Sequence, residues 1–122
     1  MSKTILIVDD DKNMCWILSK LFSEEGFKVK SATSAKEALL LIEGERISVA
    51  VLDYRLPDMN GIELFEHIKR KYCLIPSILI TSYGSKQLRE EVTEAGFFAY
   101  LDKPFSNQEL IRIIREALRD ET

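Results

Sequence analysis

Five short apolar runs, each followed by a segment with helical periodicity, constrain the fold of this chain more than any other feature of its sequence. The clearest run covers residues 48–52 and leads into Asp53 and a turn built of Pro, Asp, Asn and Gly residues. A continuous apolar run bounded by turn residues is typical of a strand that is buried on both faces, as in parallel sheets. The other runs cover residues 4–8, 27–32, 77–80 and 98–101.

Apolar residues at the spacing of an amphipathic helix follow each run. They are Met14, Ile17, Leu18, Leu21 and Phe22, then Ala38, Leu39 and Ile42, then Ile62 or Leu64 with Phe65 and Ile68, then Leu88, Val92 and Ala95, and finally Leu110, Ile113, Ile114, Ala117 and Leu118. Residues 34–37 and 106–109 have the form of capping boxes, and Gly26 and Gly96 are suited to end helices. The helix expected over residues 86–95 has the thinnest apolar face, so we expect it to be weakly docked.

The strict alternation of strand and helix predicts one α/β domain over residues 1–122. Right-handed crossovers between successive strands give a doubly wound parallel sheet with helices on both faces. We therefore expect a flavodoxin-like architecture with five strands and five helices, and this known fold has the strand order 2-1-3-4-5.

Composition and charge exclude several classes of function. The net charge of −3 argues against a protein that binds nucleic acid through a basic face. No apolar run approaches the roughly 20 residues that span a bilayer, and the first residues lack the apolar stretch of a signal peptide, so the expected compartment is the cytoplasm. Cys15 and Cys73 lack metal-ligand spacing, and we expect both to be buried and reduced.

Polar and charged residues follow the predicted strands at the point where each one ends. They are Asp9, Asp10, Asp53, Thr81, Ser82 and Lys103. The carboxyl ends of parallel strands meet at one edge of the sheet, where open α/β folds bind their ligands. Two carboxylates about 5 Å apart repel by roughly 3 kcal/mol at an effective dielectric constant near 20. A bound Mg²⁺ is the natural compensation, because it takes carboxylate oxygens and also accepts phosphate oxygens.

These motifs resemble the receiver domain of two-component response regulators. The resemblance rests on Ile7-Val8-Asp9-Asp10, Leu52-Asp53, Leu56-Pro57-Asp58-Met59-Asn60-Gly61, Ile80-Thr81-Ser82 and Tyr100-Leu101-Asp102-Lys103-Pro104-Phe105, and it extends from about residue 3 to residue 119. It implies a signalling switch in which Asp53 accepts a phosphoryl group from the phosphohistidine of a histidine kinase or phosphotransfer protein.

The resemblance also implies a role for each matching residue. Asp9, Asp10, Asp53 and the backbone carbonyl of Arg55 match the ligands of Mg²⁺, with Mn²⁺ as a substitute, and Asp10 matches the direct ligand of the acidic pair. Thr81 and Lys103 match the groups that contact the phosphoryl oxygens after transfer. Thr81 and Tyr100 match the switch pair, whose movement repacks the face formed by the fourth helix, fifth strand and fifth helix. That face would control an output domain or partner, or form a phosphorylation-dependent homodimer, without direct binding to nucleic acid or membrane.

Two other functions remain open from the sequence. A Mg²⁺-dependent phosphohydrolase with Asp53 as nucleophile is disfavoured, because Arg55 stands where a general acid is needed and no cap domain is present. An interaction module that works without phosphorylation is disfavoured because the acidic pair, Thr81 and Lys103 are all present. We expect the bulky Arg55 and Tyr83 to flank the phosphoryl group and to slow its hydrolysis.

Overall fold

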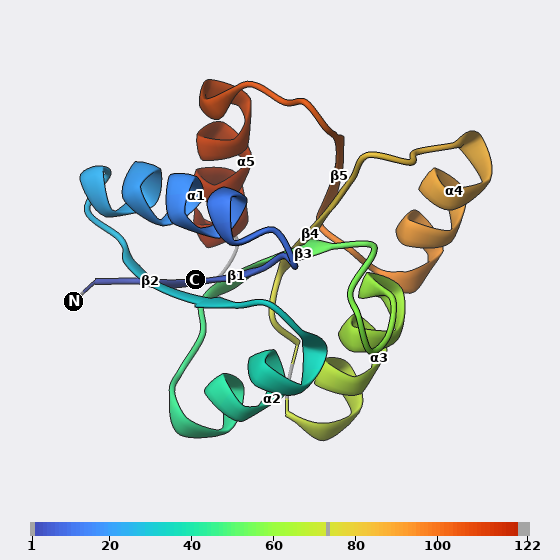
Figure 1. Cartoon of the computed structure of the whole chain (residues 1–122), viewed down its shortest axis with the longest axis horizontal. Helices are drawn as coiled ribbons and strands as arrows, with labels where there is room; N and C mark the ends of the chain where they lie inside the picture. Colours follow the sequence, from blue (N-terminus) through green and yellow to red (C-terminus); the bar gives the residue numbers. More distant parts are fainter. Residues whose placement is uncertain (1, 73, 120–122) are drawn as a thin grey trace.

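The chain forms a five-stranded parallel sheet flanked by helices on both faces (Figure 1). In this computed structural model residues 2–72 and 74–119 are described. The strands are β1 (Thr4–Val8), β2 (Lys28–Ala32), β3 (Val49–Asp53), β4 (Ser77–Thr81) and β5 (Ala99–Asp102), and the helices are α1 (Lys12–Glu24), α2 (Ala35–Gly44), α3 (Gly61–Lys71), α4 (Lys86–Ala95) and α5 (Asn107–Arg119). The strand order is β2-β1-β3-β4-β5. The predicted fold class and strand order are both confirmed.

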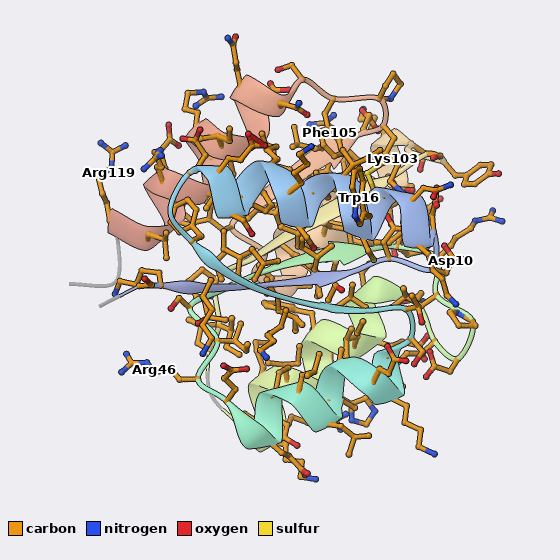
Figure 2. The ribbon with its side chains drawn as sticks, turned by 60° about the vertical axis from the view of Figure 1, so that its left-hand side comes forward. Asp10, Trp16, Arg46, Lys103, Phe105 and Arg119 are labelled. Carbon is orange, nitrogen blue, oxygen red and sulfur yellow. The ribbon has the colours of Figure 1, made fainter. Side chains whose placement is uncertain are left out.

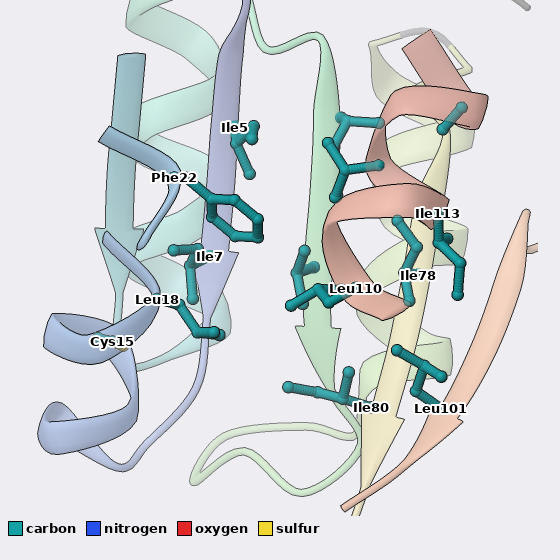
Figure 3. Packing of buried hydrophobic residues seen from close by; sticks show 14 residues of the cluster. Ile5, Ile7, Cys15, Leu18, Phe22, Ile78, Ile80, Leu101, Leu110 and Ile113 are labelled. Carbon is teal, nitrogen blue, oxygen red and sulfur yellow. The ribbon is translucent and has the colours of Figure 1, made fainter. Parts of the chain in front are cut away.

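The core lies on both faces of β1, β3 and β4, because alternate residues of each strand point to opposite sides. On one face Ile5, Val51 and Ile78 pack against α1 and α5, as Figure 3 shows for part of this cluster. On the other face Leu6 and Leu52 pack against α2 and α3. Each of the strands β1, β3 and β4 has all five of its residues buried, as expected for central strands of a parallel sheet.

Helix α4 has fewer buried side chains than any of the other four helices, as the thin apolar face in its sequence predicts. Only Leu88 and Val92 of this helix are buried. Its C-terminal end is held by Lys69, whose Nζ donates a hydrogen bond of 2.7 Å to the carbonyl oxygen of Ala95. Gly96 then ends the helix in a left-handed conformation with φ 101°. The helix is therefore fastened at its C-terminal end and held by few apolar contacts elsewhere.

The structure differs from the predicted pattern in α1. Ile17 is 48% exposed, whereas Cys15 is buried together with Leu18 and Phe22. The spacing of these three residues follows one face of a helix, and Ile17 lies one residue, or about 100°, away from Leu18 on the helix surface. Cys15 is thus buried as predicted, while Cys73 lies outside the described residues. In the described parts of the chain, no helix has both the length and the apolar character needed to cross a membrane.

Candidate functional site at the carboxyl edge of the sheet

The ends of β1, β3, β4 and β5 bring the predicted site residues to one edge of the sheet. Asp53 and Thr81 are the last residues of their strands, and Asp9 and Lys103 directly follow theirs. Figure 2 shows Asp10 and Lys103 toward the same end of the molecule, with Arg119 at the opposite end. A pocket of about 300 Å³ opens here, lined by Asp9, Asp10, Asp11, Asp53, Arg55, Ser82, Tyr83 and Lys103.

Three carboxylates meet in this pocket. One oxygen each of Asp9, Asp10 and Asp53 lie within 4.8 Å of one another. Asp9 is fully buried and Asp53 is only 6% exposed, whereas Asp10 faces solvent. Asp11 takes no part in this cluster, because its carboxylate caps α1 by accepting hydrogen bonds from the backbone N–H groups of Asn13 and Met14.

Lys103 supplies the positive charge that both buried carboxylates contact. Its Nζ lies 2.9 Å from Oδ2 of Asp9 and 3.4 Å from Oδ2 of Asp53. The other oxygen of Asp9, Oδ1, accepts a hydrogen bond of 2.9 Å from the backbone N–H of Asp11. Both oxygens of Asp9 are therefore engaged within the protein.

The crowding of charge shifts the acid–base behaviour of the site. Burial, and next the negative charge of Asp9, raise the pKa of Asp53 to about 6, although Lys103 acts in the opposite direction. Burial alone would disfavour the Lys103 cation, but the carboxylates of Asp9 and Asp53 outweigh it and raise the pKa of Lys103. Lys103 thus stays charged at neutral pH. Its single ammonium group does not cancel the burial and the repulsion from Asp9 that disfavour the ionised Asp53 carboxylate.

The donor set fits a hard divalent cation. Carboxylate oxygens are the ligands that Mg²⁺ uses in proteins, usually one or two of them together with waters. Asp10 and Asp53 are the best candidates for direct ligands, because both oxygens of Asp9 already have partners. The lining of the pocket holds four carboxylates and only two cations, Arg55 and Lys103, so it has an excess of negative charge that a divalent ion would neutralise.

Thr81 and Gly61 each make a close contact next to the site, Thr81 with the loop before α4 and Gly61 with the end of β3. Thr81 is 1% exposed, and its Oγ1 accepts a hydrogen bond of 3.0 Å from the backbone N–H of Tyr83. Gly61 lies so close to the end of β3 that a Cβ atom there would be 2.6 Å from the carbonyl oxygen of Asp53. The sequence placed Gly61 in a turn but gave no signal for this close approach, since it depends on the packing of α3 against β3.

Arg55 and Tyr83 form one rim of the pocket. The Cζ atom of Arg55 lies 4.0 Å from the centre of the Tyr83 ring, and both side chains are exposed. Such a stacked cation and ring attract one another by about 0.5–1 kcal/mol at an exposed site. The two positions that sequence analysis singled out as flanking the site therefore contact one another.

Asp58 has a role that sequence analysis missed. We expected it to shape the turn before α3, and in addition its two oxygens accept hydrogen bonds of 2.9 Å from the backbone N–H groups of Ala35 and Lys36. It therefore caps α2 from a distant loop. No sequence signal reports this contact, because 22 residues or more separate the partners.

Replacement of Asp58 by alanine is expected to lower the free energy of unfolding at pH 7 by about 1 kcal/mol, as for the loss of other helix caps. Burial opposes ionisation of Asp58, but hydrogen bonds from backbone N–H groups, with those of Ala35 and Lys36 the largest, outweigh it and lower its pKa. Its contribution is therefore present at neutral pH and is lost as pH falls below its ordinary pKa of about 4. Urea unfolding at pH 7 and pH 3 measures the difference, with Glu91→Ala on exposed α4 as the control. An equal effect of Asp58→Ala at both pH values would show that the charge of Asp58 does not strengthen the cap, and an Asp58→Ala protein as stable as the control at pH 7 would contradict the capping role.

Comparisons with known proteins agree with this architecture. The family model of the response regulator receiver domain matches residues 5–115. A response regulator receiver domain protein from Methanospirillum hungatei has 35% identity and a TM-score of 0.93, covering 98% of this chain and 96% of that chain. The BeF3-activated receiver domain of DrrB has 30% identity and a TM-score of 0.88, covering 98% and 99% of the two chains.

Curated relatives include longer regulators. The transcriptional regulator NtrC of Proteus hauseri is 31% identical over 93% of this chain and 24% of its own length. The regulatory protein AtoC of Escherichia coli is 35% identical over 94% of this chain and 25% of its own length. The chain therefore spans about a quarter of the length of these relatives. An uncharacterized 14.6 kDa protein of Leptolyngbya boryana is 37% identical over 92% of this chain and 87% of its own length.

The fold, the acidic pocket and the family match together define the class of protein. The chain belongs to the response regulator receiver domain family, whose members serve as phosphoryl-accepting switches in two-component signalling.

Proposed function

We propose that Asp53 is the phosphoacceptor and that this receiver takes a phosphoryl group from the phosphohistidine of a histidine kinase or phosphotransfer protein. The observation that carries this proposal is the position of Asp53, which ends the central strand β3 beside the acidic cluster and 3.4 Å from the ammonium of Lys103. A buried carboxylate with a raised pKa and a neighbouring cation is suited to act as a nucleophile on phosphorus.

In the transfer step, an oxygen of Asp53 forms a new bond to phosphorus while the bond from phosphorus to the imidazole nitrogen breaks. The imidazole leaves with the electron pair of that bond and takes its proton from solvent. Lys103 pairs with the phosphoryl oxygens, and the hydroxyl of Thr81 donates a hydrogen bond to one of them. Catalysis of this kind depends on positioning and on charge neutralisation.

We further propose that Asp10, Asp53 and the backbone carbonyl of Arg55 hold Mg²⁺ or Mn²⁺, with Asp9 acting through a water molecule. When bound, the ion supplies positive charge against the equatorial oxygens of the transferred group. The excess of carboxylates over cations in the pocket supports this assignment.

Phosphorylation is then read out by the packing of α4, β5 and α5. Thr81 exchanges its bond from the Tyr83 backbone for one to the phosphoryl group, and Tyr100 rotates toward the space that Thr81 leaves. Helix α4 shifts in response, because few apolar contacts hold it. The repacked face is proposed to engage an output domain, a target protein or a second copy of the chain.

Incubation with acetyl phosphate and Mg²⁺ tests the proposal. Intact-mass spectrometry is expected to detect one added phosphoryl group on the native chain and none on Asp53→Asn or in the presence of a chelator. Incorporation into Asp53→Asn would overturn the assignment. Rapid turnover of phosphate esters by the native chain would instead indicate a phosphohydrolase.

Removal of the Tyr83 ring is expected to shorten the lifetime of the acyl phosphate. The ring and the Arg55 guanidinium cover one rim of the pocket, so Tyr83→Ala opens a path for the attacking water. We expect a three- to tenfold faster loss of phosphate, about 0.6–1.4 kcal/mol in the barrier. Tyr83→Phe keeps the ring and is the matched control, and equal lifetimes for the alanine variant and the native chain would refute the shielding role.

A further inference from the structure

Three side chains at the junction of α4 and β5 contact one another in a closed set. The hydroxyl of Tyr100 donates a hydrogen bond of 2.9 Å to Oδ1 of Asp102. The guanidinium of Arg89, on α4, lies 3.4 Å from Oδ2 of Asp102 and has its Cζ atom 4.4 Å from the centre of the Tyr100 ring. Each member therefore contacts the other two.

Gly84, in the loop before α4, closes over these side chains. A Cβ atom at Gly84 would collide with the hydroxyl of Tyr100 and with the carboxylate of Asp102. Among the described glycines, left-handed φ values are found at Gly26 and Gly96 and not at Gly84. The backbone conformation at Gly84 therefore allows a side chain, but a side chain there would displace the ends of the Tyr100 and Asp102 side chains.

The contacts lie between the proposed phosphorylation site and α4. Tyr100 and Asp102 are two residues apart on β5, so they point to the same face of the sheet, and their partners on β4 are Leu79 and Thr81. The Tyr100 ring packs against the small cluster of Leu79, Leu88 and Val92 that holds α4.

Room to rearrange is available beside the contacts. A hollow of about 550 Å³ is lined by Ser82, Gly84, Ser85, Lys86, Arg89, Tyr100, Asp102 and Lys103. The Asp102 side chain is 55% exposed, so it holds the Tyr100 hydroxyl at the solvent-facing rim of the sheet. Tyr100 must give up both Asp102 and the Arg89 stack before it can turn inward.

We propose that Arg89, Tyr100 and Asp102 form a latch that stabilises the resting conformation and so sets how much of the unphosphorylated protein is in the activated conformation. This inference rests on the proposed function, because the activated conformation is the one that Asp53 phosphorylation favours. The latch joins α4 to β5 by a charged hydrogen-bonded pair, where apolar packing is thinnest. Gly84 belongs to the latch as the residue whose missing side chain leaves room for it to close.

Opening the latch without phosphorylation tests the proposal. Asp102→Ala removes the acceptor, Arg89→Ala removes the cation from the α4 side, and Gly84→Ala pushes Tyr100 and Asp102 apart. Gly44→Ala is the matched control, because a Cβ atom there meets nothing within 4 Å. The probe is beryllofluoride with Mg²⁺, a stable mimic of the acyl phosphate that binds the activated conformation.

Each latch variant is expected to bind beryllofluoride three- to tenfold more tightly than the native chain, because the apparent affinity for a ligand is proportional to the fraction of protein in the binding-competent conformation. In proteins labelled with fluorotyrosine, the ¹⁹F resonance of Tyr100 in the variants is expected to move toward its beryllofluoride-bound position before the probe is added. A purely structural role would lower stability without moving this resonance.

The outcomes separate the latch from the proposed function. If the native chain neither binds beryllofluoride nor takes up phosphate, the proposed function fails whatever the variants do. If the native chain binds but the latch variants bind like Gly44→Ala, or more weakly than the native chain, the latch is refuted. Asp102 directly precedes Lys103, whereas Arg89 lies on α4. If Arg89→Ala and Asp102→Ala have the same effect, that effect cannot arise only from a displaced Lys103.

Discussion

Replacement of Lys103 by methionine is expected to lower the free energy of unfolding of the metal-free protein by about 3 kcal/mol at pH 7, the lower end of the cost of breaking a buried ion pair. Methionine preserves most of the volume of lysine but leaves Asp9 and Asp53 without their shared cation. Asp9 is fully buried in the native protein, so without the ammonium its ionised carboxylate keeps only part of the solvation that it has in the unfolded chain.

Urea unfolding with and without Mg²⁺ measures this effect. Mg²⁺ is expected to restore part of the lost stability, because it binds the folded state and supplies charge to the same carboxylates. Lys86→Met, at an exposed position on α4, is the control and is expected to change stability by less than about 0.5 kcal/mol. A Lys103→Met protein as stable as this control would contradict the electrostatic account of the pocket.

The residues of the candidate site were predictable because the signals that place them are local. Each strand is marked by its own apolar run, and parallel strands end at the same edge, so Asp53 and Lys103 meet although 50 residues separate them. The strand order came from the resemblance to a known family, since periodicity alone does not order strands within a sheet.

Contacts between elements carried no such signal. Asp58 caps α2 from another loop, and the position of Gly84 lies against two side chains of β5 that leave no free space for a Cβ atom. The exposure of Ile17 was missed for a related reason. The face of α1 that packs against the sheet is narrower than the set of apolar residues on this helix, and Ile17 lies outside that face. In each case the determining partner lies on an element that is distant in sequence.

Replacement of Asp53 by asparagine is expected to stabilise the metal-free fold by about 2 kcal/mol at pH 8, although the same change is expected to abolish phosphorylation. The pKa of Asp53 is raised to about 6 in the folded protein, first by burial and then by Asp9, so the folded state holds this proton more tightly than the unfolded chain does. Ionisation of Asp53 therefore costs stability as pH rises from about 4 to 6, and the full cost is present above that range. Because asparagine has the same shape and no charge, its advantage is expected to be near zero at pH 4, to grow through this window and to stay constant above it.

Saturating Mg²⁺ is expected to remove or reverse the advantage of asparagine at pH 8, because Mg²⁺ binds the native carboxylate and asparagine is a poor substitute for that carboxylate as a ligand. Thermal unfolding across this pH range, with and without Mg²⁺, measures both effects, and an advantage that does not depend on pH would show that Asp53 bears no excess charge repulsion in the folded protein.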